Sequence, residues 1–133
     1  MSTSGCALGG VLLAAALGCR QQPQTWARES HLTRSLERDV PVTSARRDEP
    51  GSVYFVVALA DAPVGGRLEL QCAWRSPSGK LARENAFETR RITRPDWPTH
   101  CKMAISRETE AGRWSVAMLR DQATLATAEL RVE

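Results

Sequence analysis

The segment of residues 67–75 alternates more regularly between apolar and polar side chains than any other part of the chain. Leu68, Leu70, Cys72 and Trp74 fall on one side of an extended backbone, and mostly charged or polar residues fall on the other. A period of two places one face of a β-strand in the core and the other in water. The chain is therefore expected to build a sheet with one buried face.

Other segments predict strands of the same kind. Residues 53–59 form a β-branched and aromatic run that is too short for a typical helix, and they predict a central buried strand. Alternation returns at residues 101–105, residues 112–132 predict a hairpin, and a weaker strand is expected between residues 79 and 91. With turn signals between these segments, the sequence predicts an all-β antiparallel sandwich of six or seven strands.

The last hairpin carries a resemblance to a known type of domain. The segment Gly112-Arg113-Trp114-Ser115-Val116, followed by Leu119 and residues 125–132, resembles the final two strands of immunoglobulin-like modules on bacterial surface proteins. The resemblance covers residues 50–133. It implies an immunoglobulin-like sandwich and concerns architecture alone.

Cys72 and Cys101 both fall on the inferred inward faces of their strands, so a disulfide between them is geometrically sensible. Closing a loop of about 30 residues stabilises the fold by roughly 3.5 kcal/mol in the chain-entropy model. In immunoglobulin domains the bridge links the second and sixth strands, whereas Cys101 is expected on about the fifth. Such a bond also requires an oxidising compartment, so the disulfide and export of the protein depend on each other.

An uncharged run at residues 7–18 ends at Cys19 and is followed at once by a polar segment. As a helix it would reach only about 18 Å, which is short of the hydrocarbon core of a bilayer. This pattern resembles the signal peptide and lipid-attachment site of a bacterial lipoprotein. The resemblance implies a diacylglyceryl thioether on Cys19, and Arg20, standing where many such proteins carry an inner-membrane retention Asp, favours the outer membrane.

A second cleavage site competes with this one. Residues 14–16 satisfy the A-x-A rule, and cleavage after Ala16 would release a soluble secreted protein. Lipidation is preferred because Cys6 leaves with the signal, Cys72 and Cys101 can pair, and an exported Cys19 left alone would be a reactive thiol.

The resulting domain organisation is a signal peptide at 1–18, a lipidated flexible tether at 19–30 and a β-sandwich at 31–133. The first strand, placed at 31–42, rests on the alternation of Leu32, Arg34, Leu36 and Arg38. Trp26, Leu32, Leu36 and Val40 are spaced in a way that also fits a short amphipathic helix. The strand is preferred because the rest of the chain is consistently β.

Charge and motifs narrow the possible functions. The net charge of +3, from 18 basic and 15 acidic residues, is too mild for a nucleic-acid binder. His31 and His100 are the only histidines, and His100 points away from its neighbour Cys101 if both lie in a strand. No spacing of Cys and His residues fits a zinc site. Gly65-Gly66 is expected to connect two strands and not to form a phosphate-binding loop, and Glu108 and Glu110 are expected in a solvated loop. We therefore expect no enzyme activity, no cofactor and no metal.

A basic cluster beside a tryptophan is the best candidate for binding. Arg90, Arg91 and Arg94 precede Trp97, which stands between two prolines in an expected loop. Arg and Trp are frequent at binding hot spots. The alternative is that the arginines line a solvated edge strand and that Trp97 plugs one end of the sandwich.

These observations together predict an envelope lipoprotein, anchored through Cys19 to a membrane, with the outer membrane preferred, and facing the periplasm or the cell surface. Its sandwich would be a noncatalytic binding or scaffolding domain for an envelope protein or an anionic polymer, and no nucleic acid is expected. The alternatives are a small periplasmic inhibitor of a cell-wall hydrolase such as lysozyme, acting through a protruding loop, and a soluble secreted binding protein.

Overall fold

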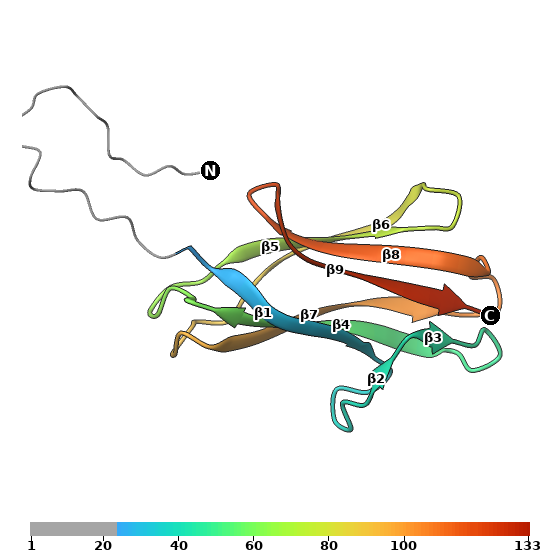
Figure 1. Ribbon diagram of the computed structural model, residues 1–133, viewed down its shortest axis with the longest axis horizontal. Coiled ribbons are helices and arrows are strands. Elements are labelled where there is room, and N and C mark those ends of the chain that lie inside the picture. Colours follow the sequence, from blue (N-terminus) through green and yellow to red (C-terminus); the bar gives the residue numbers. More distant parts are fainter. Residues whose placement is uncertain (1–23) are drawn as a thin grey trace, which may run out of the picture.

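The computed structural model describes residues 24–133, which form two β-sheets packed face to face (Figure 1). The strands in chain order are β1 (Trp26–Thr33), β2 (Pro41–Val42), β3 (Ser44–Ala45), β4 (Gly51–Ala60), β5 (Glu69–Arg75), β6 (Leu81–Glu88), β7 (Trp97–Ile105), β8 (Gly112–Arg120) and β9 (Ala123–Val132). Seven of these strands are long and two have only two residues each. The predicted all-β sandwich of six or seven strands is confirmed.

The two sheets have the orders β2-β1-β4-β7 and β3-β9-β8-β5-β6. All neighbouring strands are antiparallel except β3, which runs parallel to β9. β1 lies against β9 across the sandwich, so the short strands β2 and β3 belong to one lateral side. On the opposite side, β6 and β7 are the outer strands of their sheets.

The alternating patterns read from the sequence mark the core correctly. Every second side chain of β4 is fully buried, and β4 lies between β1 and β7 as a central strand should. In β5 the predicted inward residues are buried, and the predicted hairpin of residues 112–132 is β8 with β9. The largest fully buried side chains are Trp74, Phe55, Leu59, Ile92, Ile105 and Met118.

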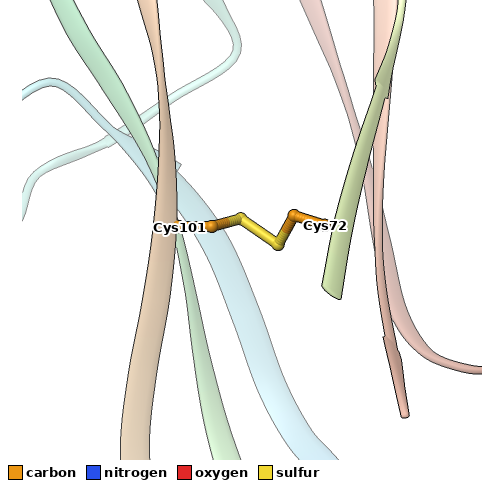
Figure 2. The surroundings of a disulfide bond; sticks show 2 residues. All are labelled: Cys72 and Cys101. Atoms are coloured by element: carbon orange, nitrogen blue, oxygen red, sulfur yellow. A yellow bond between two sulfur atoms is a disulfide. The ribbon is translucent and has the colours of Figure 1, made fainter. Parts of the chain in front are cut away.

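Cys72 of β5 and Cys101 of β7 form a disulfide that connects the two sheets through the core (Figure 2). Their Cα atoms are 6.6 Å apart, and the bond closes a loop with a sequence separation of 29 residues. The predicted disulfide is confirmed. Among the seven long strands these are the third and the fifth, so the bridge differs from the usual immunoglobulin connection, as the sequence indicated.

The first strand lies elsewhere than predicted. β1 spans Trp26–Thr33, so five of the residues assigned to the tether, 26–30, belong to the sandwich. Residues 34–38, expected to continue the strand, form a turn in which the Asp39 amide donates to the Ser35 carbonyl at 2.7 Å. The sequence pattern failed because a β-bulge between Ala27 and Glu29 shifts the alternation of β1.

All nine strands, the buried core and the disulfide lie within residues 25–133. This part of the chain therefore contains every element that the sandwich needs in order to fold. Among the residues that the structure describes, no helix is long and apolar enough to cross a membrane.

Candidate functional site

The antiparallel strands sort the connections of the sandwich into two groups, one at each end (Figure 1). At the end where β1 begins lie loop 61–68, loop 89–96 and turn 121–122, and we call this end the N-terminal pole. At the end where Glu133 lies are loops 46–50, 76–80 and 106–111, and we call it the C-terminal pole.

Loop 89–96 carries the three arginines that the sequence singled out, and it is firmly attached to loop 61–68. The Ile92 amide donates to the Gly66 carbonyl at 2.8 Å, and the Gly65 amide donates to the Ile92 carbonyl at 2.7 Å. The Thr89 amide donates to the Leu68 carbonyl at 2.9 Å, and the Ile92 side chain is fully buried. The loop is thus a platform that lies against its neighbour, not a protruding finger.

Arg90, Arg91 and Arg94 point from this platform into solvent, and none of them makes a salt bridge within the described residues. Three acidic residues of the same pole have other partners. Asp96 pairs with Arg28 at 3.3 Å, and Asp61 accepts a hydrogen bond from the indole of Trp26 at 2.9 Å. Asp121 lies 3.9 Å from its neighbour Arg120. The positive charge of the three arginines is therefore not neutralised locally.

Trp97 is the first residue of β7, not part of a loop as expected. It pairs with the buried Leu59, and its side chain is partly buried against the core. The Arg94 guanidinium lies over the Trp97 ring, 5.7 Å from its centroid, at cation–π distance. The structure thus places Trp97 at the end of the core, as in the alternative derived from the sequence. The arginines lie in the loop between β6 and β7, not along an edge strand.

His31 and His100 lie in one row across the outer face of a sheet, because both pair with Val56 of β4. The ring of His100 makes an edge-to-face contact with Tyr54, with centroids 5.8 Å apart. Partial burial lowers the pKa of His100, and the charges of Lys102 and Arg90 lower it further. His31 shares a hydrogen bond of 2.6 Å with Asp39. No spacing in the sequence indicates that the two histidines share a row.

The C-terminal pole gathers basic and acidic residues around one hollow. A shallow hollow of about 510 Å³ is lined by Arg46, Arg47, Asp48, Arg107 and Glu133. Arg46 donates two hydrogen bonds to the Asp48 carboxylate, at 2.9 and 2.7 Å, and this contact lowers the pKa of Asp48.

A second hollow of about 490 Å³ opens on the lateral side of the same pole, between the outer strands β6 and β7. Met103 and Trp114, both nearly buried, contribute to its lining, and Leu81 is 45% exposed there. Charged residues on its rim include Lys80, Arg83, Glu108 and Glu110. We call this hollow the lateral groove. Glu108 and Glu110 lie in loop 106–111, as the sequence predicts, but the groove itself was not predicted.

Among the residues that the structure describes, no group of three or more His, Cys, Asp or Glu side chains is placed to hold a metal ion. His100 lies on the outer face of β7, while Cys101 is buried in the disulfide. The predicted separation of these neighbours is therefore confirmed. Cys19, the predicted lipidation site, lies outside the described residues.

The structure also contains functional features that sequence reasoning missed. The apolar Ile92 within the basic run of residues 90–94 is the one local signal of a buried anchor in this loop. Successive long strands run in opposite directions, so the order of the predicted strands places loop 89–96 at the same end of the sandwich as the start of β1. No local signal predicts the lateral groove, because it arises from strands of two different sheets.

Comparison with known proteins bears on the fold. The sequence matches no protein-family model and has no significant match among curated protein sequences. An immunoglobulin-like protein from Pseudomonas aeruginosa resembles the structure with a TM-score of 0.57 at 13% identity, covering 84% of this chain and 98% of that one.

A second similar structure is the alkylpurine DNA glycosylase AlkC of Pseudomonas fluorescens, solved bound to DNA with an abasic-site analogue. Its TM-score is 0.50 at 17% identity, and the match covers 82% of this chain but only 30% of the glycosylase. At such identities a structural likeness concerns the fold and does not extend to activity. With its two face-to-face sheets and this likeness to the P. aeruginosa protein, the chain carries an immunoglobulin-like β-sandwich.

Proposed function

We propose that this protein is an envelope lipoprotein, anchored through Cys19, whose immunoglobulin-like sandwich is a noncatalytic binding domain. The observation that carries the proposal is the Cys72–Cys101 disulfide in the core, because such bonds persist in oxidising compartments outside the cytoplasm. Export is what the apolar run before Cys19 would provide. Several acyl chains on one residue would hold the protein firmly on a membrane.

The binding surface in this proposal is the N-terminal pole, where Arg90, Arg91 and Arg94 lack acidic partners within the described residues. Arg94 and Trp97 add a guanidinium stacked on an indole. Guanidinium groups bind carboxylates and phosphates in a bidentate manner, so the surface suits an anionic partner in the envelope. The outer membrane, with the domain facing the periplasm or the cell surface, is the proposed location.

The intact mass of the protein extracted from membranes tests the anchor. Cleavage before Cys19, acyl groups on that residue and an oxidised cystine should all appear in one measurement. A soluble product beginning at Leu17 would replace the proposal with a secreted binding protein. Retention of residues 1–18 in a protein with reduced Cys72 and Cys101 would refute both anchoring and export.

The lateral groove supports a second candidate, the binding of an extended segment of an envelope protein. β6 and β7 each pair with one strand only, so both have unpaired backbone groups beside the groove. The exposed Leu81 offers an apolar contact between charged rims. Leu81→Arg should abolish copurification of a partner after mild detergent extraction, whereas Leu36→Arg, also at an exposed leucine, should not. Inhibition of lysozyme by the purified protein would favour the hydrolase inhibitor instead.

A further inference from the structure

We infer that the N-terminal pole docks on the surface of the bilayer that holds Cys19, with its arginines on the headgroups of anionic phospholipids. The inference rests on the proposed anchor, because the anchor sets which end of the sandwich faces the membrane. It deepens the proposed function by assigning the anionic partner of Arg90, Arg91 and Arg94.

The first argument for this inference is the short length of chain between Cys19 and the sandwich. β1 begins at Trp26, seven residues after Cys19. Seven residues can span at most about 25 Å even when fully extended. The start of β1 therefore cannot move farther than this from the lipid attachment. The sandwich is long in the direction of its strands, so the N-terminal pole stays near the surface whereas the C-terminal pole can lie farther from it (Figure 1).

The charge of the pole carries the second step. Three arginines of loop 89–96 project into solvent, and the described structure offers them no carboxylate. A basic side chain near an anionic leaflet strengthens binding about fivefold, and this attraction decays within a Debye length. Three such contacts give a free protein measurable affinity when anionic lipid is in excess. They act more strongly on an anchored protein, because the anchor keeps the local concentration high.

Exposed apolar side chains at the same pole carry the third step. Trp26 is 48% exposed at the start of β1, and Val64 is 59% exposed in the adjoining loop 61–68. The indole Nε1 of Trp26 already donates to Asp61, which leaves the ring carbons as its exposed part. Tryptophan is enriched at the level of lipid headgroups, where one end of the side chain is apolar and the other polar.

The platform itself carries the fourth step. The arginine loop is attached to loop 61–68 by backbone hydrogen bonds on both sides of the buried Ile92. The arginines therefore extend from one preformed loop, whose backbone needs little further ordering for contact with the bilayer. An anionic polymer in solution could use the same charges, but it would not explain why they gather at the end nearest the anchor.

The test separates docking from anchoring. The mature chain, residues 19–133 with Cys19→Ser, lacks the acyl chains and retains the whole sandwich. Its co-sedimentation is measured with vesicles of phosphatidylcholine alone and with vesicles that contain phosphatidylglycerol. Binding is expected only with the anionic lipid and should weaken steeply when salt is added. Addition of these vesicles should also shift the tryptophan fluorescence of the protein to shorter wavelength, because Trp26 is the most exposed of its four tryptophans.

Two triple variants provide the matched comparison. Replacing Arg90, Arg91 and Arg94 with Gln should weaken vesicle binding by roughly a hundredfold, about fivefold for each residue. Replacing Arg46, Arg47 and Arg107 with Gln at the C-terminal pole should change it less than about twofold. All six residues are on the surface, so circular dichroism and thermal unfolding should show folded proteins in both cases.

Three outcomes would overturn the inference. These are equal binding to neutral vesicles, equal loss in the two triple variants, and binding to heparin without binding to anionic vesicles. The last result would assign the arginines to a soluble anionic polymer. The proposed anchor is judged separately by the intact mass of the native protein, so the failure of docking and the failure of lipidation remain distinguishable.

Discussion

The two poles of the sandwich carry similar numbers of arginines but use them differently. At the C-terminal pole, Arg46 is held by Asp48, whereas Arg47 and Arg107 line a hollow that also contains Glu133. At the N-terminal pole, Asp96 pairs with Arg28 and Asp61 accepts a hydrogen bond from Trp26, and three arginines of one loop have no described ionic partner. The arrangement of charge, and not its amount, therefore distinguishes the two poles.

The largest effect is expected from a change that should affect both poles alike. Replacing Cys72 and Cys101 with Ala should lower the free energy of unfolding by about 3.5 kcal/mol, because the unfolded chain loses a cross-link. Denaturant unfolding measures this loss, and hydrogen exchange should quicken at both poles. A reducing agent should destabilise the natural protein and leave the variant unchanged. An equally stable variant would show that the cystine does not hold the sheets together.

A change at Ile92 should loosen the N-terminal pole alone. The side chain is fully buried, so Ile92→Ala should cost about 3 kcal/mol through lost burial and a cavity. Amide exchange should quicken at Gly65 and Ile92, which bond across the two loops, and not at Thr109, whose amide bonds to Ser106 at the other pole. Uniform quickening would mean that the poles are not independent, and it would weaken the comparison drawn above.

A change at Gly112 should act on the C-terminal pole. Gly112 has a φ of 130°, and a Cβ there would lie 2.9 Å from Pro77. Gly112→Ala should therefore cost about 2 kcal/mol, from backbone strain and from displacement of loop 76–80. Gly79→Ala is the matched control, because Gly79 has a φ of 86° but open space around its Cβ position. Similar losses in both variants would show that the contact with Pro77 is not important.

The smallest effect concerns pH and the row of histidines. The pKa of His100 is lowered in the folded state, by burial first and then by Lys102 and Arg90. The unfolded chain therefore binds a proton at His100 more readily, so the free energy of unfolding should fall as the pH drops below about 6.5. His100→Gln should flatten this fall, as measured by unfolding at pH 7.5 and pH 5. An unchanged slope in the variant would assign the pH dependence to other groups.

Sequence reasoning predicted most of the strands because their alternation is local. Residues such as Leu70 and Trp74 report their burial through their spacing alone, and so the sandwich and the disulfide were accessible from the sequence. The sequence does not predict the position of β1 correctly, for two reasons. Its bulge interrupts the alternation of apolar and polar residues. Its outer face carries Glu29 and His31, while its inner face is only partly buried, so the contrast between the two faces is weak. The alternation of apolar and polar residues at Leu36 and Arg38 predicts a strand, but Leu36 is an exposed residue of a turn.

The candidate site was predicted only in part. The cluster of Arg90, Arg91, Arg94 and Trp97 was found from composition, but its meaning depends on what lies beside it in space. Asp96 forms a salt bridge with Arg28, and Ile92 binds the loop to Gly66. Both are tertiary contacts between segments that are far apart in the sequence. The spacing of residues within a single sequence does not predict such contacts.

The short strands β2 and β3 have a consequence for how the sandwich can meet other β-structures. Each of them pairs with only two residues of its neighbour, β2 with Leu32 and Thr33 of β1 and β3 with Arg131 and Val132 of β9. These four residues lie toward the C-terminal pole, so the short strands block the addition of a further strand there and leave the rest of β1 and β9 paired on one side. A strand from another molecule could therefore add on either flank of the sandwich, along β1 or β9 as well as along β6 or β7.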